Sequence, residues 1–243
     1  MSREVPQAAD TRLGPQLPLG ISLAPGATFD AYFAGANGLV VELLRAMGRG
    51  DAGCERQAFL AADRGLGKSH LLQATCRTAG DCGARAAYLP LAGDMALRPE
   101  LLEGLETLDL VALDAVDAVA GDDVWERGIF SLINSARQTG TRLVFAAERV
   151  PAEMALRLAD LGSRLAWGPI VQLVPLSEEA RRQALVQRAA TLGLELPASV
   201  ADYLQRHYPR DLAGQLERLA TLDCASLASG RRLTVPFVKE VLG

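Results

Sequence analysis

A glycine-rich segment at 63–69, with the sequence DRGLGKS, lies between a short apolar run and a helical pattern. A strand, a glycine-rich turn and a helix in this order are the context that a phosphate-binding loop requires. Gly65 and Gly67 allow backbone N–H groups to turn toward phosphate oxygens, and the following helix adds the positive end of its dipole. Lys68 would neutralise the terminal phosphates and Ser69 would hold magnesium. The segment therefore predicts a nucleotide-binding site.

The usual phosphate-loop pattern begins with glycine, whereas this chain has Ala62 at that position. A methyl group there is tolerated if the backbone angle φ is negative and is costly otherwise. The alternative interpretation is an ordinary glycine-rich turn that precedes a helix. The GxGKS core in its strand-to-helix context favours the phosphate loop.

Short apolar runs recur along the chain and alternate with several helical patterns. Such runs are typical of a buried, mostly parallel sheet with helices on both faces. They predict strands at 58–62, 86–91, 108–113, 142–147 and 170–174. A helix is also expected from Asn37 to about Arg49. The remaining chain has helical patterns at 177–192, 198–207 and 210–228, then an extended piece at 233–236 and a last helix at 237–242. We expect an arm at 1–24, an α/β domain at 25–175 and a small helical domain at 176–243.

Composition limits the partners of the chain. The 243 residues are 49% hydrophobic and carry a net charge of −4, which disfavours a free-standing nucleic-acid binder. The four cysteines form no CxxC pair, so a zinc site is not expected. No signal-peptide-like start or bilayer-length apolar run is evident. A cytoplasmic protein without a membrane partner is therefore expected.

A second chemical element is the run LDLVALD at 108–114, which ends in a carboxylate. At the carboxyl edge of a parallel strand, Asp114 faces the ligand crevice and can hold magnesium through water. NTPases that hydrolyse efficiently commonly place another acid next, but this chain has Ala115. We therefore expect weak or no intrinsic ATPase activity. Asp117 is a substitute for the missing acid, and the alternative is that these carboxylates only cap a helix.

Two arginines are candidates for sensing phosphate. Arg164 lies between the fourth and fifth expected strands, and Arg210 opens a helix after Pro209. Surface arginines are more often solvated than catalytic, so neither position is informative by itself. Trp125 and Trp167 are interpreted as packing residues rather than ligand contacts.

The order of these motifs resembles the DnaA-type family of AAA+ ATPases, from about Gln16 to Gly243. The matching segments are TFDAYF, GLGKSHLLQA, LVALDAVDAV, TRLVFAAERVP, SRLAWG and PRDLAGQLERL. The resemblance implies an AAA+ P-loop fold with a five-stranded parallel sheet and a helical lid. Within this family, the chain more narrowly resembles the regulatory inactivators of DnaA, which lack the C-terminal DNA-binding domain. The negative net charge and the stop at Gly243 agree with the expectation that such a regulator has no DNA-reading domain.

The resemblance also implies roles for single residues. It places 29–35 at the adenine side of the nucleotide and makes Glu148 the sensor-1 residue. Arg164 becomes an arginine finger that acts in trans, and Arg210 becomes the sensor-2 arginine of the lid. The implied nucleotide-binding set is Gly65, Gly67, Lys68, Ser69, His70, Asp114, Glu148 and Arg210, with ADP or ATP and Mg²⁺ as cofactors. Ser69 and Asp114 would meet the Mg²⁺ through the nucleotide.

Within the arm, the sequence QLPLG at 16–20 is similar to the motif by which replication proteins bind the bacterial sliding clamp. Gln16 would form a hydrogen bond at the rim of the clamp's cleft, with Leu17 and Leu19 buried in it. The alternative is a flap that packs on its own domain. Weak docking would be strengthened by avidity on a clamp that offers more than one site.

The main hypothesis is a nucleotide-bound regulator that, with the DNA-loaded clamp (the β subunit of DNA polymerase III), stimulates ATP hydrolysis by DnaA. It would thereby repress re-initiation of replication, touch DNA only through the clamp and associate with the replisome. A second hypothesis is an autonomous AAA+ ATPase that remodels or loads a replication factor within its own oligomer. A third is a clamp-binding adaptor with a vestigial phosphate loop. The resemblance leaves homo-oligomer formation open.

Overall fold

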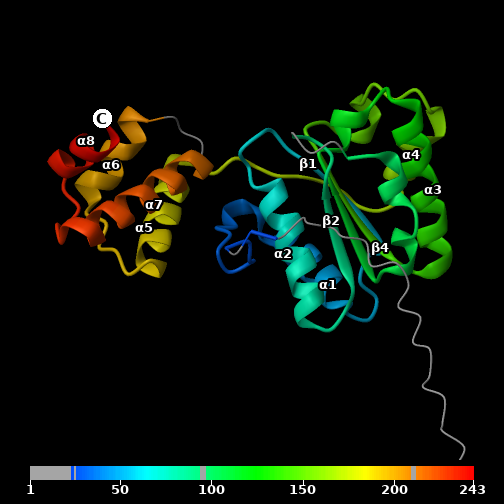
Figure 1. Cartoon of the computed structure of the whole chain (residues 1–243), viewed down its shortest axis with the longest axis horizontal. Coiled ribbons are helices and arrows are strands. Elements are labelled where there is room, and N and C mark those ends of the chain that lie inside the picture. The colour runs from blue at the N-terminus through cyan, green and yellow to red at the C-terminus, as the bar shows by residue number, and fades with distance from the viewer. Residues whose placement is uncertain (1–22, 25, 94–96, 209–211) are drawn as a thin grey trace, which may run out of the picture.

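Five parallel strands form one sheet in the order β2-β3-β4-β1-β5 (Figure 1). The computed structural model describes residues 23–243 except 25, 94–96 and 209–211. The strands are β1 (Gln57–Ala61), β2 (Ala86–Pro90), β3 (Leu110–Asp114), β4 (Arg142–Ala147) and β5 (Ile170–Gln172). Each was predicted within two residues at both ends. The α/β fold expected from the alternating pattern is confirmed.

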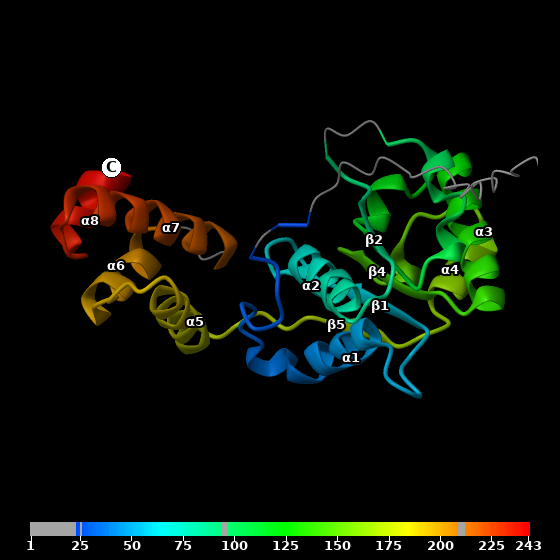
Figure 2. The same cartoon turned by 60° about the horizontal axis from the view of Figure 1, so that its bottom comes forward.

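Two layers of helices cover the sheet, as Figures 1 and 2 show. On one face lie α1 (Gly38–Arg49) and α2 (Lys68–Asp81). On the other lie α3 (Asp123–Thr139) and the short α4 (Ala159–Leu165). The 3₁₀ turns are Gly35–Asn37, Pro99–Leu102, Leu105–Thr107, Val116–Val119 and Pro151–Glu153. Because both faces are covered, the central strands are buried on both sides, which explains their unbroken apolar sequences.

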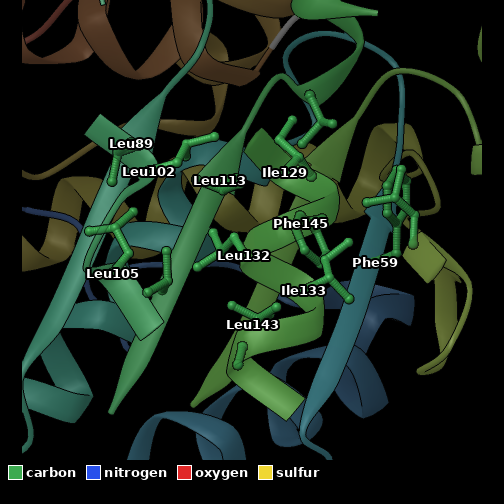
Figure 3. Close-up of a cluster of buried hydrophobic side chains, with 14 of the residues drawn as sticks. Phe59, Leu89, Leu102, Leu105, Leu113, Ile129, Leu132, Ile133, Leu143 and Phe145 are labelled. Carbon is green, nitrogen blue, oxygen red and sulfur yellow. The ribbon is translucent and has the colours of Figure 1, made fainter. Parts of the chain in front are cut away.

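Alternate residues of β1, β2, β3 and β4 belong to two separate cores. Phe59 and Phe145 stack at 6.4 Å between ring centroids and pack with Ile129 and Leu132 of α3 (Figure 3). The residues between them on the strands, such as Leu60, contact α1 and α2 instead. This two-residue alternation fixes which side chains point to each helical layer.

The four C-terminal helices gather at one end of the molecule, around a core of their own (Figure 2). They are α5 (Glu178–Thr191), α6 (Ala198–His207), α7 (Leu212–Ser229) and α8 (Val235–Leu242). The expectation of an extended piece at 233–236 is partly wrong, because α8 already begins at Val235. Thr234 caps α8 through Phe237 N, and Pro236 is tolerated in a first helical turn. No helix within the described residues is long and apolar enough to cross a membrane.

The connector between the sheet and α5 is bound to the start of α1. Asn37 is buried, and its side chain makes two hydrogen bonds with the backbone of Val174. Asn37 Nδ2 donates to Val174 O at 3.0 Å, and Val174 N donates to Asn37 Oδ1 at 2.8 Å. The two bonds satisfy backbone groups of Val174, which lies past the end of β5 and has no strand partner there. They also fix the point at which the chain leaves the sheet.

Candidate nucleotide-binding site and the position of Arg164

The segment at 63–69 forms a tight loop between β1 and α2. Gly65 and Gly67 have φ angles of +81° and +88°, a region that side chains rarely adopt. A Cβ atom on Gly67 would lie 2.7 Å from the ring of Tyr32, whose hydroxyl donates to Leu66 O at 3.2 Å. Ala62 is not strained, because Ala115 is the one non-glycine residue with positive φ in the described part of the chain.

Lys68 begins α2 and folds back over the loop. Its ammonium donates to Ala62 O at 2.5 Å and to Asp63 O at 3.0 Å. Both acceptors are neutral carbonyls, so the positive charge of Lys68 is not cancelled by these contacts. The first N–H groups of a helix lack intrahelical acceptors, and together with Lys68 they suit an anion.

A cavity of about 730 Å³ brings most of the predicted site residues together. Its lining includes Gly65, Gly67, Lys68, Ser69, His70, Asp114 and Glu148. Tyr88 and Asp117 also line it. The phosphate loop thus faces the carboxyl ends of β3 and β4, at the edge where ligands of parallel sheets bind.

Asp114 is only 5% exposed, and its carboxylate accepts two hydrogen bonds. Tyr88 Oη donates to Asp114 Oδ2 at 2.8 Å, and Ala115 N donates to Oδ1 at 2.9 Å. Burial, with the charge of Asp114 beside it, raises the pKa of Tyr88, so the phenol stays a donor. Sequence reasoning missed Tyr88, since a tyrosine within a strand signals only packing until the neighbouring strand is known.

Asp117 does not cap a helix with its side chain. Its Oδ2 accepts from Glu148 N at 3.2 Å, which ties the turn after β3 to the end of β4. The carboxylate of Glu148 pairs with Arg64 Nε at 3.1 Å. Because Arg64 is almost fully exposed, this pair contributes little to stability. It does place a second cation of the loop at the cavity, one that sequence reasoning had not singled out.

A second cavity, of about 370 Å³, shares Gly65, Gly67 and His70 with the first. Ala31, Tyr32 and Phe33 line it with Leu176 and Leu216, so it is largely apolar, as a base requires. Phe29 instead lies buried in the core. His70 Nε2 lies 2.7 Å from Thr28 O, and burial lowers the pKa of His70, which favours the neutral imidazole.

Arg164 lines neither cavity. It belongs to α4, which lies against α3 (Figure 1). Its guanidinium carbon is 4.0 Å from the ring centroid of Phe130, and its Nε donates to Asn134 Oδ1 at 3.0 Å. The side chain is 23% exposed. Trp167 is 44% exposed, and the guanidinium carbons of Arg164 and Arg137 lie 5.2 and 4.5 Å from the centroid of its ring, so it packs against these arginines at the surface and not in a core. Trp125 is buried as expected.

The remaining predicted site residues are Arg210, Gln16, Leu17 and Leu19, which lie outside the described residues. Among the described residues, no group of three or more His, Cys, Asp and Glu side chains is arranged to hold a metal ion. Ser69 and Asp114 would therefore hold Mg²⁺ only together with the phosphates of a nucleotide. The glycine loop, the start of α2 and Lys68 fit those phosphates.

Comparisons with known proteins match this architecture. Residues 178–242 match the family model described as the lid domain of Hda. Domain III of the replication initiation protein DnaA from Thermotoga maritima is 19% identical, with a TM-score of 0.77 over 91% of this chain and 98% of that one. DnaA from Aquifex aeolicus, solved with bound AMPPCP, is 24% identical, with a TM-score of 0.69 over 86% and 69%. The RuvB Holliday junction branch migration motor of Thermotoga maritima reaches 0.63 at 15% identity, over 84% and 66%.

Proposed function

The chain has a DnaA-type AAA+ fold with an Hda lid domain, and on this basis we propose that it is a nucleotide-bound regulator of DnaA. It binds ADP or ATP with Mg²⁺ in its own cavity and presents Arg164 to the ATP of a neighbouring DnaA. Tethered to the DNA-loaded sliding clamp, it stimulates hydrolysis of that ATP and so represses re-initiation. Its three parts are the arm at 1–24, the α/β domain at 25–175 and the lid at 176–243.

The observation that carries this proposal is the separation of Arg164 from the chain's own nucleotide cavity. Arg164 contacts α3 and Trp167, whereas the phosphate loop opens at the ends of β1, β3 and β4. An arginine in this position suits a nucleotide that another subunit brings to it. Asn134 accepts only from Nε of Arg164, so the two terminal nitrogens of the guanidinium remain for phosphate oxygens. Asp160 lies 3.9 Å from Nη1 and is largely exposed, which makes it a weak competitor.

The chain's own nucleotide has a structural task in this proposal. Lys68, Ser69 and Asp114 hold it, and Glu148 lies at the sensor-1 position of the same cavity. The residue after Asp114 is Ala115, which has no group to orient water and adopts φ +56°. The resident nucleotide is therefore bound more than it is turned over. Arg210, which lies outside the described residues, is the residue that we propose for the lid's contact with this nucleotide.

Docking on the clamp is the remaining part of the proposal. Gln16, Leu17 and Leu19 bind the cleft of the clamp as an extended segment. One such contact is weak, and a clamp with more than one site raises the effective concentration of the regulator near DnaA on DNA. This placement brings Arg164 within reach of its target.

The test is single-turnover hydrolysis of radiolabelled ATP bound to DnaA, with clamp loaded on DNA. The wild-type chain accelerates hydrolysis, Arg164→Ala lowers the stimulated rate by about 10³-fold or more, and Leu17→Ala loses the part of the stimulation that the loaded clamp provides. Arg206→Ala, which removes an exposed arginine of the lid, is the matched control and retains full stimulation.

No acceleration by the wild-type chain would discard this proposal. The autonomous ATPase would then be favoured if the chain assembles with nucleotide and shows steady-state hydrolysis that Lys68→Ala abolishes. Stimulation that survives Arg164→Ala would remove the finger from the mechanism.

A further inference from the structure

The helix that carries Arg164 is too short to hold itself in place. With only seven residues, α4 is far below the length at which an isolated helix is stable. Both of its ends, however, are bonded to buried polar side chains from other elements.

At the N-terminal end, the bonding side chain is Glu126 of α3, which is 1% exposed. The N-cap residue of α4 is Leu158, whose side chain cannot accept a hydrogen bond. Glu126 accepts instead from Leu158 N at 2.6 Å, from Arg157 N at 3.0 Å and from Gly121 N at 2.7 Å. From another helix, the carboxylate thus binds the N–H of the N-cap residue, as the glutamate of a capping box does within its own helix.

At the C-terminal end, the bonding side chain is Gln57, the first residue of β1. Its Nε2 donates to Arg164 O at 2.7 Å and to Leu165 O at 3.1 Å, two of the last carbonyls of α4. Arg164 O also accepts from Trp167 N at 3.2 Å. Gly168 passes so close that a Cβ atom there would lie 1.8 Å from Gln57 O. The return of the chain from α4 to β5 is therefore fixed against the same residue.

From these contacts we infer that Glu126 and Gln57 are positioning residues for Arg164. They fix the main chain of α4 at both ends, and Phe130 and Asn134 then hold the guanidinium. A finger acts only when its nitrogens meet the transferred phosphoryl group in the right geometry, and misplacement by 1 Å can cost about 10²-fold in rate. This inference rests on the proposed function for its effect on hydrolysis, but not for the position of Arg164 itself.

The first experiment measures that position without DnaA. In ¹⁵N NMR spectra of the full chain, Arg164→Lys identifies the Arg164 Nε–H signal, which the bond to Asn134 protects from exchange. In Glu126→Gln and in Gln57→Met this signal shifts and exchanges at least tenfold faster. Glu103→Gln and Gln183→Met change exposed residues of the same types and leave the signal as in the wild type.

The second experiment measures DnaA–ATP hydrolysis over a range of regulator concentrations. At saturation, Glu126→Gln and Gln57→Met stimulate about 10- to 100-fold less than the wild type. The half-saturating concentration and the affinity for the chain's own nucleotide change less than twofold. A purely structural role would lower the melting temperature and leave the saturating rate intact.

The two experiments separate the two ideas. If the wild-type chain fails to stimulate DnaA, the proposed function fails, while the exchange rates still decide the inference. Unchanged Arg164 signals in both variants, or wild-type saturating rates, would overturn the inference. Should Gln57→Met not fold by circular dichroism, Gln57→Asn, which shortens the side chain by one methylene, takes its place.

Discussion

The phosphate loop and α4 each carry a cation that we propose meets a phosphate, but the two cations are positioned in different ways. The loop is positioned by its own main chain, through Gly65, Gly67 and the start of α2. Arg164 is positioned by side chains from β1 and α3, more than 25 residues away along the chain. A contiguous motif can thus be recognised in a sequence, whereas an anchored helix depends on contacts that no local pattern records.

Gly67→Ala is the sharpest test of the idea that the phosphate loop is positioned by its own main chain. The new methyl group would meet Tyr32 at 2.7 Å and would occupy a left-handed conformation. We expect the free energy of unfolding to fall by about 2–4 kcal/mol, from strain and overpacking together. Urea denaturation of Gly67→Ala and the wild type measures this change in the free energy of unfolding. Tyr32→Leu in the same chain recovers part of the loss; an undiminished loss would show that the contact with Tyr32 is irrelevant.

The idea that α4 is positioned by side chains from other elements is tested by the pH dependence of stability in Glu126→Gln. Burial opposes ionisation of Glu126, but hydrogen bonds from Leu158, Arg157 and Gly121 outweigh it and lower the pKa of the carboxyl. Its stabilisation is therefore complete above the unfolded pKa, about 4.3, and is lost as the pH falls through the lower folded pKa. At pH 7 the variant is less stable by about 1.5–3 kcal/mol.

Denaturation of both forms between pH 7 and pH 3 measures this difference. The gap between wild type and Glu126→Gln narrows below about pH 4.3. A gap that stays constant or widens as acid is added would contradict the assignment of Glu126 as a buried, ionised acceptor.

An effect no larger than that of Glu126→Gln tests whether the two regions are independent. Lys68→Ala removes the cation that the loop offers to phosphate, and a hydrogen bond to a charged group is worth about 1.5–3 kcal/mol. We therefore expect the affinity for ADP to fall by about 10- to 150-fold in titration calorimetry. Arg164→Ala is the comparison variant and changes this affinity less than twofold. A large loss in Arg164→Ala would mean that the finger also serves the chain's own nucleotide.

The smallest expected effect is at Ala115, the non-glycine residue with positive φ in the described part of the chain. Because glycine adopts this conformation without the Cβ penalty, Ala115→Gly should stabilise the protein by about 1 kcal/mol. Thermal unfolding measures the change, and a lower melting temperature would show that the methyl group packs favourably. The same substitution at Ala118, in the 3₁₀ turn that follows, should destabilise instead.

The strands, the phosphate loop and the helical C-terminal region were predictable because each depends on neighbours in the sequence. The apolar run at 142–147 predicted both ends of β4, and the glycine-rich turn at 63–69 predicted that a helix follows it, which is α2. The start of α8 was missed because Pro236 suggested an extended segment, while Thr234 caps a helix there. That Trp167 packs on two arginines at the surface could not be predicted, because an aromatic residue in a motif shows nothing of its exposure.

Local chemistry in the amino-acid order was thus sufficient for the fold class and for the loop that we propose binds phosphate. Folding alone decided that Tyr88 would bind Asp114, that Glu126 would cap a helix other than its own, and that Gln57 would bond the other end of that helix. Periodicity and glycine spacing act over a few residues and leave a trace in the sequence. A hydrogen bond between distant elements depends on strand order and helix packing, which exist only once the chain is folded.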